Sequence, residues 1–137
     1  DVLEAVAEQS PEDVNDVWAA VDAQREQWFA ARFRRAANGT WRADEETAIV
    51  DAAPFAAQLG PGDALTGPVV ARLRVSLPAG VKVVPLEHAL PLAETIGRLA
   101  QRQYAAGRRD DLWTLAPLYF RPSAAEENAV EKLSTSG

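Results

Sequence analysis

One aspartate stands where a metal-dependent nuclease could use it. Asp22 ends the apolar run at residues 17–22, which predicts a buried strand. A two-metal nuclease needs several carboxylates converging on its Mg²⁺ ions. The predicted helix at 52–59 and the predicted strand end at 65–67 supply no acid. We therefore interpret Asp22 as a strand-end residue that hydrogen-bonds its own turn, and we assign no metal ligand.

The single histidine, His88, is the only residue through which a Ser-His-Asp mechanism could run. Ser76 and Thr66 are the nucleophiles that the fold could bring near it, but nothing in their spacing indicates this. Cysteine is absent, which excludes thiol catalysis, disulfides and cysteine metal sites. We interpret His88 as a surface or capping residue and assign no catalytic residue.

The first predicted turn, at residues 22–26, contains no glycine. A phosphate-binding turn needs backbone N–H groups that can approach the ligand closely, and glycine usually provides that access. Neither common glycine-rich nucleotide motif occurs in the chain. Residues 60–62 and 67–68 combine glycine with proline, which removes a donor, so they indicate loops. We expect no ATP binding and no cofactor.

Composition is that of one globular domain: 137 residues, 47% hydrophobic and 25% charged. No apolar run reaches the length of a membrane helix. The absence of cysteine fits a reducing compartment, and we expect a cytoplasmic protein that does not contact membranes. The chain begins with Asp1 rather than methionine, which favours a piece of a longer protein.

The net charge of -6 comes from six acids within residues 1–16, because the remaining charges balance. Five arginines form the one basic cluster: Arg25, Arg32, Arg34, Arg35 and Arg42. We interpret this cluster as the charged edge of a sheet rather than as a nucleic-acid contact. The four tryptophans are expected in the core and on the sheet faces: Trp18, Trp28, Trp41 and Trp113.

Hydrophobic periodicity predicts the elements that would position these residues. Helices are expected at 1–9, 52–59, 69–77 and 89–106, and strands at 17–22, 27–35, 41–50, 64–66 and 81–84, with an extended apolar segment at 112–121. Asn38 and Gly39 predict a hairpin between the second and third strands. The predicted inward stripe of the last helix is Leu92, Ile96, Leu99, Ala100 and Gln103. The predicted core includes Phe29, Phe33, Leu65, Val83, Ile96 and Leu99.

Three meandering strands followed by alternating helices and strands require a mixed sheet with helices on both faces. The predicted fold class is α/β, a single ribonuclease H-like lobe with a five-stranded mixed sheet. The same plan builds each lobe of actin-like ATPases. This step concerns the fold and carries no function by itself.

Several segments together resemble the TsaB (YeaZ) family, which takes part in making threonylcarbamoyladenosine in bacterial tRNA. Residues 21–33 (VDAQREQWFAARF) resemble its "DARR-x-E-V-Y-x-A-x-Y" strand-turn-strand, and residues 1–7 (DVLEAVA) resemble its "S-T-L-E-A-L-A" helix. Residues 115–121 (LAPLYFR) resemble its closing "L-x-P-x-Y-L-R". Its "P-x-A-x-x-L-A-x-L-A" helix is similar to the segment with Pro85, Ala89, Leu92, Ala93, Leu99 and Ala100.

The chain also departs from that family. Gln24 stands where the family usually has arginine, and Gly67-Pro68 stands where "G-x-G" is common. The family's opening lobe, with its "L-A-I-D-T-S" strand, has no counterpart here. The resemblance therefore implies a second lobe only: a connecting helix and linker at 1–16, a C-terminal lobe at 17–122 and a flexible tail at 123–137.

The resemblance implies a non-catalytic scaffold. Its implied partners are a TsaD-like catalytic subunit and a TsaE-like ATPase, bound through the full-length protein, with tRNA contacted indirectly. Partner-binding residues are not assigned, and a homodimer stays open. The alternative function is enzymatic: the chain would be an enzyme domain, either a degenerate ribonuclease H-like nuclease or a glycoprotease-type peptidase.

Overall fold

The computed structural model describes residues 1–111, 113, 114 and 116. Along the chain the elements are α1 (Val2–Glu8), β1 (Asp16–Asp22), β2 (Gln27–Arg35), β3 (Trp41–Ala43), β4 (Ala48–Asp51), α2 (Ala52–Gln58), β5 (Ala64–Thr66), the 3-10 helix η1 (Pro68–Arg72), β6 (Lys82–Val83), α3 (Leu86–Ala89) and α4 (Ala93–Ala105). Among the helices of this described part, none is long and apolar enough to cross a bilayer. The predicted segments at 112–121 and 123–137 lie wholly or mostly outside the described residues.

The sheet is mixed, as predicted, with strand order β3-β2-β1-β5-β6 and β4 paired to β2. β1 runs antiparallel to β2, with Val17 opposite Phe33, and parallel to β5, with Trp18 opposite Leu65. β5 and β6 are also parallel. The change from antiparallel to parallel pairing on the two sides of β1 confirms the predicted α/β class.

The predicted third strand, 41–50, is two strands. β3 pairs with β2 as far as Ala43 opposite Phe33, and β4 resumes with Ala48 opposite Ala30. Four residues, 44–47, therefore face only two on β2, so the chain bulges outward. Three consecutive carboxylates, at 44–46, lie in this bulge and are exposed. Their mutual repulsion and need for water account for the interruption.

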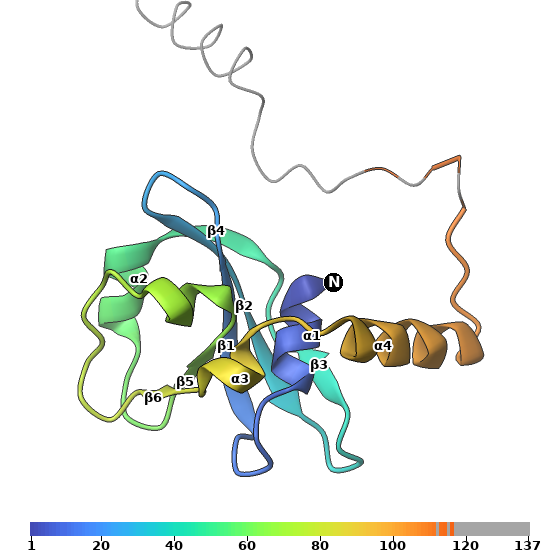
Figure 1. Ribbon diagram of the computed structural model, residues 1–137, viewed down its shortest axis with the longest axis horizontal. Helices are drawn as coiled ribbons and strands as arrows, with labels where there is room; N and C mark the ends of the chain where they lie inside the picture. Colours follow the sequence, from blue (N-terminus) through green and yellow to red (C-terminus); the bar gives the residue numbers. More distant parts are fainter. Residues whose placement is uncertain (112, 115, 117–137) are drawn as a thin grey trace, which may run out of the picture.

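Two apolar clusters pack on opposite faces of the sheet. One holds α1 against β1 and β2 and is made of Leu3, Val6, Ala7, Val14, Val17, Ala19, Ala31, Phe33, Trp41, Ala64 and Val84. The other lies under α2 and η1 and is made of Ala20, Trp28, Ala30, Ala52, Ala56, Leu65 and Val69. Helices α1 and α2 lie on opposite sides of the strands (Figure 1). Alternation along β1 and β2 produces this division, because successive side chains point to opposite faces.

The predicted core is partly right. Phe33, Leu65 and Leu99 are buried, and Phe29 is half-buried. Val83 and Ile96 are 42% and 45% exposed, so their assignment to the core was wrong. Val83 lies on β6, the edge strand, where only one side has a neighbour.

Two predicted helices are shorter than expected. The helix at 69–77 is the 3-10 helix η1 only, and residues beyond it pack as irregular chain, including Val75 and Leu77. Valines restrict the helix there, because branching at Cβ costs side-chain freedom. The helix predicted at 89–106 begins only at Ala93, as α4, and Ala89 instead ends the short helix α3, since Pro91 disfavours the helical conformation of the residue preceding it.

The inward stripe of α4 agrees with the prediction at Leu99, but it runs through Thr95 rather than Ile96, a shift of one residue there, and Ala100 is exposed. Thr95 and Leu99 are buried, whereas Leu92 and Ile96 are about half exposed. The shift follows from polar contacts with α1, which a hydrophobic pattern cannot detect. Gln9 accepts the Leu92 N–H at 2.9 Å, and the Gln103 side chain donates to Glu4 at 3.3 Å. These bonds turn the polar residues of α4 toward α1.

Candidate functional site

The turn between β1 and β2 holds Asp22 in a local role. Its Oδ1 accepts the Gln24 N–H at 2.8 Å, which confirms the prediction that this carboxylate bonds its own turn. Gln24, Arg25 and Glu26 all have positive φ, at 62°, 52° and 60°. Left-handed conformation costs about 1–2 kcal/mol for each such residue. No glycine marks this turn, so the sequence contained no signal for its geometry.

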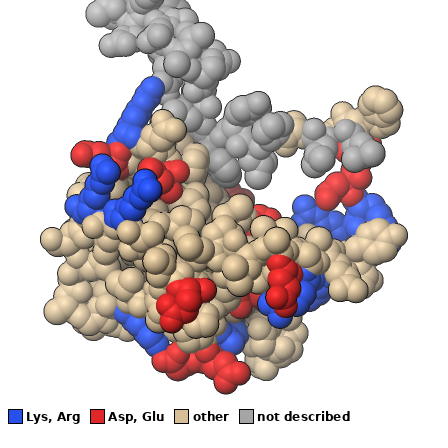
Figure 2. Space-filling view, in the orientation of Figure 1, with Lys and Arg blue, Asp and Glu red and all other residues tan. Residues whose placement is uncertain are grey.

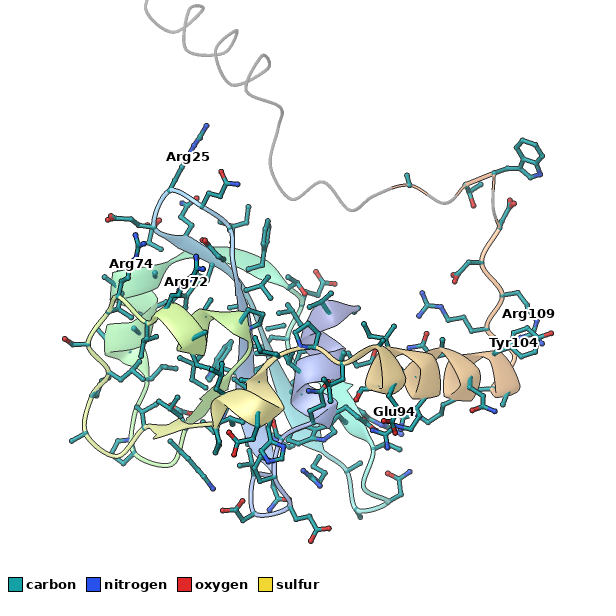
Figure 3. The ribbon with its side chains drawn as sticks, in the orientation of Figure 1. Arg25, Arg72, Arg74, Glu94, Tyr104 and Arg109 are labelled. Carbon is teal, nitrogen blue, oxygen red and sulfur yellow. The ribbon has the colours of Figure 1, made fainter. Side chains whose placement is uncertain are left out.

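Hydrogen bonds at both ends hold this left-handed turn in place. The Ala23 N–H donates to the Gln27 carbonyl at 2.8 Å, and the Gln27 N–H donates to the Gln24 carbonyl at 3.0 Å. The Glu26 carbonyl accepts the N–H of Ala52 at 2.9 Å, which ties the turn to α2. At the tip, Arg25 points away from the body of the protein (Figure 3).

A metal-dependent nuclease site does not assemble around Asp22 in the part of the chain that the structure describes. No group of three or more His, Cys, Asp or Glu side chains converges there. α2 carries no acid, and β5 ends at Thr66 and Gly67 without one. The described residues therefore supply one of the several carboxylates that two Mg²⁺ ions require.

His88 lies in the last turn of α3 and is exposed. The backbone N–H of His88 donates to the Pro85 carbonyl at 2.9 Å, and the backbone carbonyl of His88 accepts a hydrogen bond from the Gln9 side-chain amide at 3.3 Å. The Thr66 hydroxyl is buried and lacks a hydrogen-bond partner in the structure. Within the described residues, no hydrogen bond joins His88 to Ser76 or Thr66. These residues do not form the nucleophile–base pair of a hydrolase.

Two arginines of the predicted basic cluster, Arg32 and Arg34, are ion-paired. Arg32 donates to both oxygens of Asp16, at 2.8 and 3.1 Å, and lies 3.8 Å from Asp63. Arg34 contacts Asp16 at 3.3 Å and Asp44 at 3.0 Å. The hydrogen bonds that Arg32 donates to the Asp16 carboxylate raise the pKa of Arg32 above its ordinary value. Lys and Arg side chains are interspersed with Asp and Glu on the face shown in Figure 2.

Arg35 has a structural role within the same cluster. Its terminal nitrogen donates to the carbonyls of Ser10 and Pro11, at 2.9 and 3.0 Å, and its guanidinium lies 4.7 Å from the centre of the Trp41 ring. It thereby attaches the segment after α1 to β2. Arg32, Arg34 and Arg35 lie on β2, which pairs with β1 and with β3 and β4, so they are inside the sheet and the interpretation of the cluster as a sheet edge was wrong for them. Arg42 alone among the five lies on the outer strand β3.

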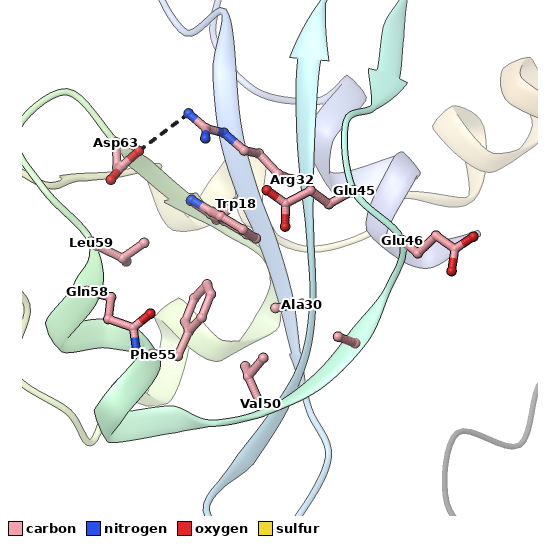
Figure 4. A pocket seen from close by; sticks show the side chains of 11 residues that line it. Trp18, Ala30, Arg32, Glu45, Glu46, Val50, Phe55, Gln58, Leu59 and Asp63 are labelled. Carbon is pink, nitrogen blue, oxygen red and sulfur yellow. Dashed lines mark ion pairs between the residues drawn. The ribbon is translucent and has the colours of Figure 1, made fainter.

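A cavity of about 460 Å³ opens between β2, β4 and α2, and it is the candidate binding site of the described chain. Its aromatic wall is Trp18 of β1 and Phe55 of α2, whose rings meet edge to face with centres 5.0 Å apart. Ala30 and Val50 add apolar surface from β2 and β4 (Figure 4). Such a volume suits a small ligand or one inserted side chain.

Charged groups surround the open side of this cavity. Arg32 and Asp63 line one end, and Glu45 and Glu46 come from the bulge between β3 and β4. In Figure 4 the side chain of Glu45 lies beside the cavity near Arg32, while that of Glu46 points away. No motif could have revealed this site, because its walls come from four elements that only the sheet pairing brings together.

The tryptophans divide between core and surface. Trp28 and Trp41 are buried, as predicted, and Trp18 is half-buried on the sheet face. Trp113 is 96% exposed, so its assignment to the core was wrong. It follows α4, beyond the elements that cover the sheet.

Large apolar side chains stay exposed along the chain from β6 to the start of α4. We name this stretch the α3–α4 apolar surface, and its members are Val83, Leu86, Leu90, Leu92 and Ile96, each 42–50% exposed. α4 extends sideways from the body of the protein (Figure 1). Large apolar side chains left exposed within one stretch of chain favour a surface that another domain or protein covers.

Comparisons with solved structures find the same arrangement of elements in YeaZ. A Pseudomonas aeruginosa protein described as uncharacterised and similar to the peptidase YEAZ superposes with a TM-score of 0.64 at 20% identity, covering 87% of this chain and 56% of its own. YeaZ from Pseudomonas aeruginosa gives 0.64 at 21%, covering 85% and 56%. This chain thus spans a little over half the length of these two proteins.

No family model and no curated protein matches the sequence. The likeness to the two solved structures therefore concerns the fold. It confirms the predicted actin-like, ribonuclease H-like arrangement of a mixed sheet with helices on both faces. The chain has a YeaZ-like fold.

Proposed function

We propose that this chain is the C-terminal lobe of a two-lobed protein of the TsaB (YeaZ) family, acting as a non-catalytic scaffold in threonylcarbamoyladenosine modification of tRNA. One observation carries the proposal. The segment most similar to the family in sequence, residues 21–33, coincides with the end of β1, the left-handed turn and β2, at the centre of a YeaZ-like fold. The sequence resemblance thus falls on two neighbouring strands inside the sheet of this fold, which supports the proposal.

The α3–α4 apolar surface supports the two-lobed part of the proposal. A lobe that folds as one half of a larger protein leaves apolar side chains at the seam with the other half. Leu92 and Ile96 occupy such positions on a helix that packs against α1 through its opposite, partly polar face. YeaZ chains are longer than this one, with 56% of their length matched. In the proposed two-lobed protein, the other lobe, which corresponds to the unmatched part of YeaZ, would cover this surface.

The partners follow from the proposed family role. A TsaD-like catalytic subunit would carry out the chemistry, a TsaE-like ATPase would assist it, and tRNA would be contacted indirectly. Among the described residues, Asp22 bonds its own turn without joining a group of metal ligands, and His88 has no nucleophile hydrogen-bonded to it. Both observations favour a scaffold over an enzyme domain. Arg32 and Arg34 of β2 are paired to carboxylates, which favours indirect over direct contact with RNA.

Genetic complementation tests this function. The complete reading frame that encodes this chain is expressed in a bacterium depleted of its own TsaB, and threonylcarbamoyladenosine is quantified in tRNA hydrolysates. Restored modification is expected from the complete frame and not from residues 1–137 alone. A stable full-length product that restores nothing would exclude the proposal.

A biochemical measurement addresses the alternative of an enzyme domain. The purified chain is incubated with Mg²⁺ and labelled RNA or DNA, and separately with a labelled protein substrate. We expect no cleavage, because the described chain shows one carboxylate where several are needed and no paired nucleophile and base. Metal-dependent cleavage of nucleic acid, lost in Asp22→Asn, would favour the nuclease instead.

A further inference from the structure

We propose that the cavity between Trp18 and Phe55 binds the guanidinium group of an arginine side chain presented by a partner protein. The cavity has about 460 Å³, more than one arginine side chain fills, so flanking peptide can also enter. This inference is independent of the proposed role in tRNA modification.

Aromatic rings provide the first reason for choosing a planar cation. Trp18 and Phe55 meet edge to face, at 84° between ring planes, and Trp28 lies beyond with its centre 6.1 Å from that of Phe55. Guanidinium groups stack on aromatic faces more readily than other charged side chains do. The protein already shows this contact, because Arg32 lies 5.7 Å from the centre of the Trp18 ring.

The balance of charge is the second reason. The cavity is lined by three acids, Glu45, Glu46 and Asp63, against one base, Arg32. Arg32 is already paired with Asp16 and Asp63. Asp63 also accepts a hydrogen bond from the Gly60 N–H at 2.8 Å. Glu45 has no ion pair or hydrogen bond with any described residue. A carboxylate thus remains available beside the aromatic wall, and it accepts a guanidinium in bidentate geometry.

The same groups exclude other ligand classes. A phosphate-bearing nucleotide would meet the carboxylates of Glu45 and Asp63 with Arg32 already paired, which is electrostatically unfavourable. A free amino acid would also bring its own α-carboxylate, for which no available cation lines the cavity. An arginine within a peptide avoids this repulsion, since its α-groups are in amide bonds. The geometry therefore favours a partner protein over a free metabolite as the source.

Nuclear magnetic resonance can detect this contact directly. The indole N–H signal of Trp18, assigned by its loss in Trp18→Phe, is followed while N-acetyl-arginine methylamide is added. We expect a saturable shift with a dissociation constant of the order of millimolar, as for one exposed ion pair with a stacking contact. The neutral isostere N-acetyl-citrulline methylamide should give no saturable shift, and free arginine should bind more weakly than the capped form.

Variants that each remove one carboxylate charge distinguish binding of arginine at this cavity from the general attraction of a cation to an acidic protein. Glu45→Gln removes the available carboxylate, whereas Glu87→Gln removes the same charge from α3, outside the cavity lining. Both residues are exposed, so both variants should fold. We expect Glu45→Gln to weaken binding about three- to fivefold and Glu87→Gln to leave it unchanged. Equal weakening by both variants, equal binding of citrulline, or no Trp18 shift would each overturn the proposal.

Discussion

Arg102 on α4 donates to both carboxylate oxygens of Glu8 on α1, at 2.9 and 3.1 Å, across 94 positions of sequence. This hydrogen bonding raises the pKa of Arg102 above its ordinary value. Beside the ion pair, Gln9 bonds to the carbonyl of Leu90 at 2.6 Å and to the N–H of Leu92 at 2.9 Å. The first described helix therefore holds the last one in place.

Helix α1 should stay docked on its own chain at all protein concentrations. Seven residues are too few for a stable isolated helix, but Leu3, Val6 and Ala7 are buried in the core. Hydrogen exchange of amides 2–9 should show protection that is the same in dilute and concentrated samples. Protection that appears only as a dimer forms would contradict this docking.

Replacing Gly67 by alanine should destabilise the fold strongly. Its φ is +104°, and an added Cβ would lie 2.1 Å from the carbonyl oxygen of Ala20, on the neighbouring strand. We expect Gly67→Ala to lower the free energy of unfolding by about 3 kcal/mol or more. Gly39→Ala is the matched control, because Gly39 has φ +80° but open space around it, and only about 1–2 kcal/mol is expected. Urea denaturation measures both, and equal losses would show that the backbone at residue 67 can move aside.

The two candidate apolar positions on α4 should respond differently to truncation. Leu99 is 5% exposed and Ile96 is 45% exposed. Leu99→Ala should lower the free energy of unfolding by about 2–4 kcal/mol, as large-to-small core changes do. Ile96→Ala should stay within about 0.5 kcal/mol in the isolated chain. A loss for Ile96→Ala as large as that for Leu99→Ala in chemical denaturation would show that both side chains face the core, as hydrophobic periodicity predicted.

The chain should not bind ATP with useful affinity. The turn that follows β1 lacks glycine, and the N–H groups of Ala23, Gln24 and Gln27 are already bonded within it. A phosphate cradle needs such donors to be available. Calorimetry with ATP and Mg²⁺ should therefore show no saturable heat. A micromolar isotherm would contradict this expectation.

Asp13 should titrate below the ordinary range of an aspartate. A hydrogen bond from the Lys82 ammonium is the main cause that lowers its pKa. Because the folded pKa lies below the unfolded one, the pair adds stability above the unfolded pKa, and this is lost as pH falls through the folded pKa. Side-chain carbon shifts of Asp13 measured against pH should move back to the ordinary range in Lys82→Gln. Identical titrations in both proteins would show that Lys82 has no part in the shift.

Local sequence determined much of the fold. A short apolar run located β1, period-two alternation located β2, and Asn38-Gly39 predicted the hairpin that joins β2 to β3. Asp22 was correctly assigned to its own turn. These features depend on near neighbours, so their physical causes are present in short segments. The same locality explains the predicted division of the sheet into antiparallel and parallel halves, because short and long connections impose it.

Tertiary structure alone decided the orientation of α4 and the cavity. The inward stripe passes through Thr95 and Leu99 rather than Ile96, because Glu4 and Glu8 bind the polar residues of α4 from another helix. The cavity joins Trp18, Val50 and Phe55 from β1, β4 and α2, and leaves Glu45 beside them because the strand bulges there. Such contacts depend on relative placement of distant segments, and hydrophobic periodicity reports only how each segment buries its own face.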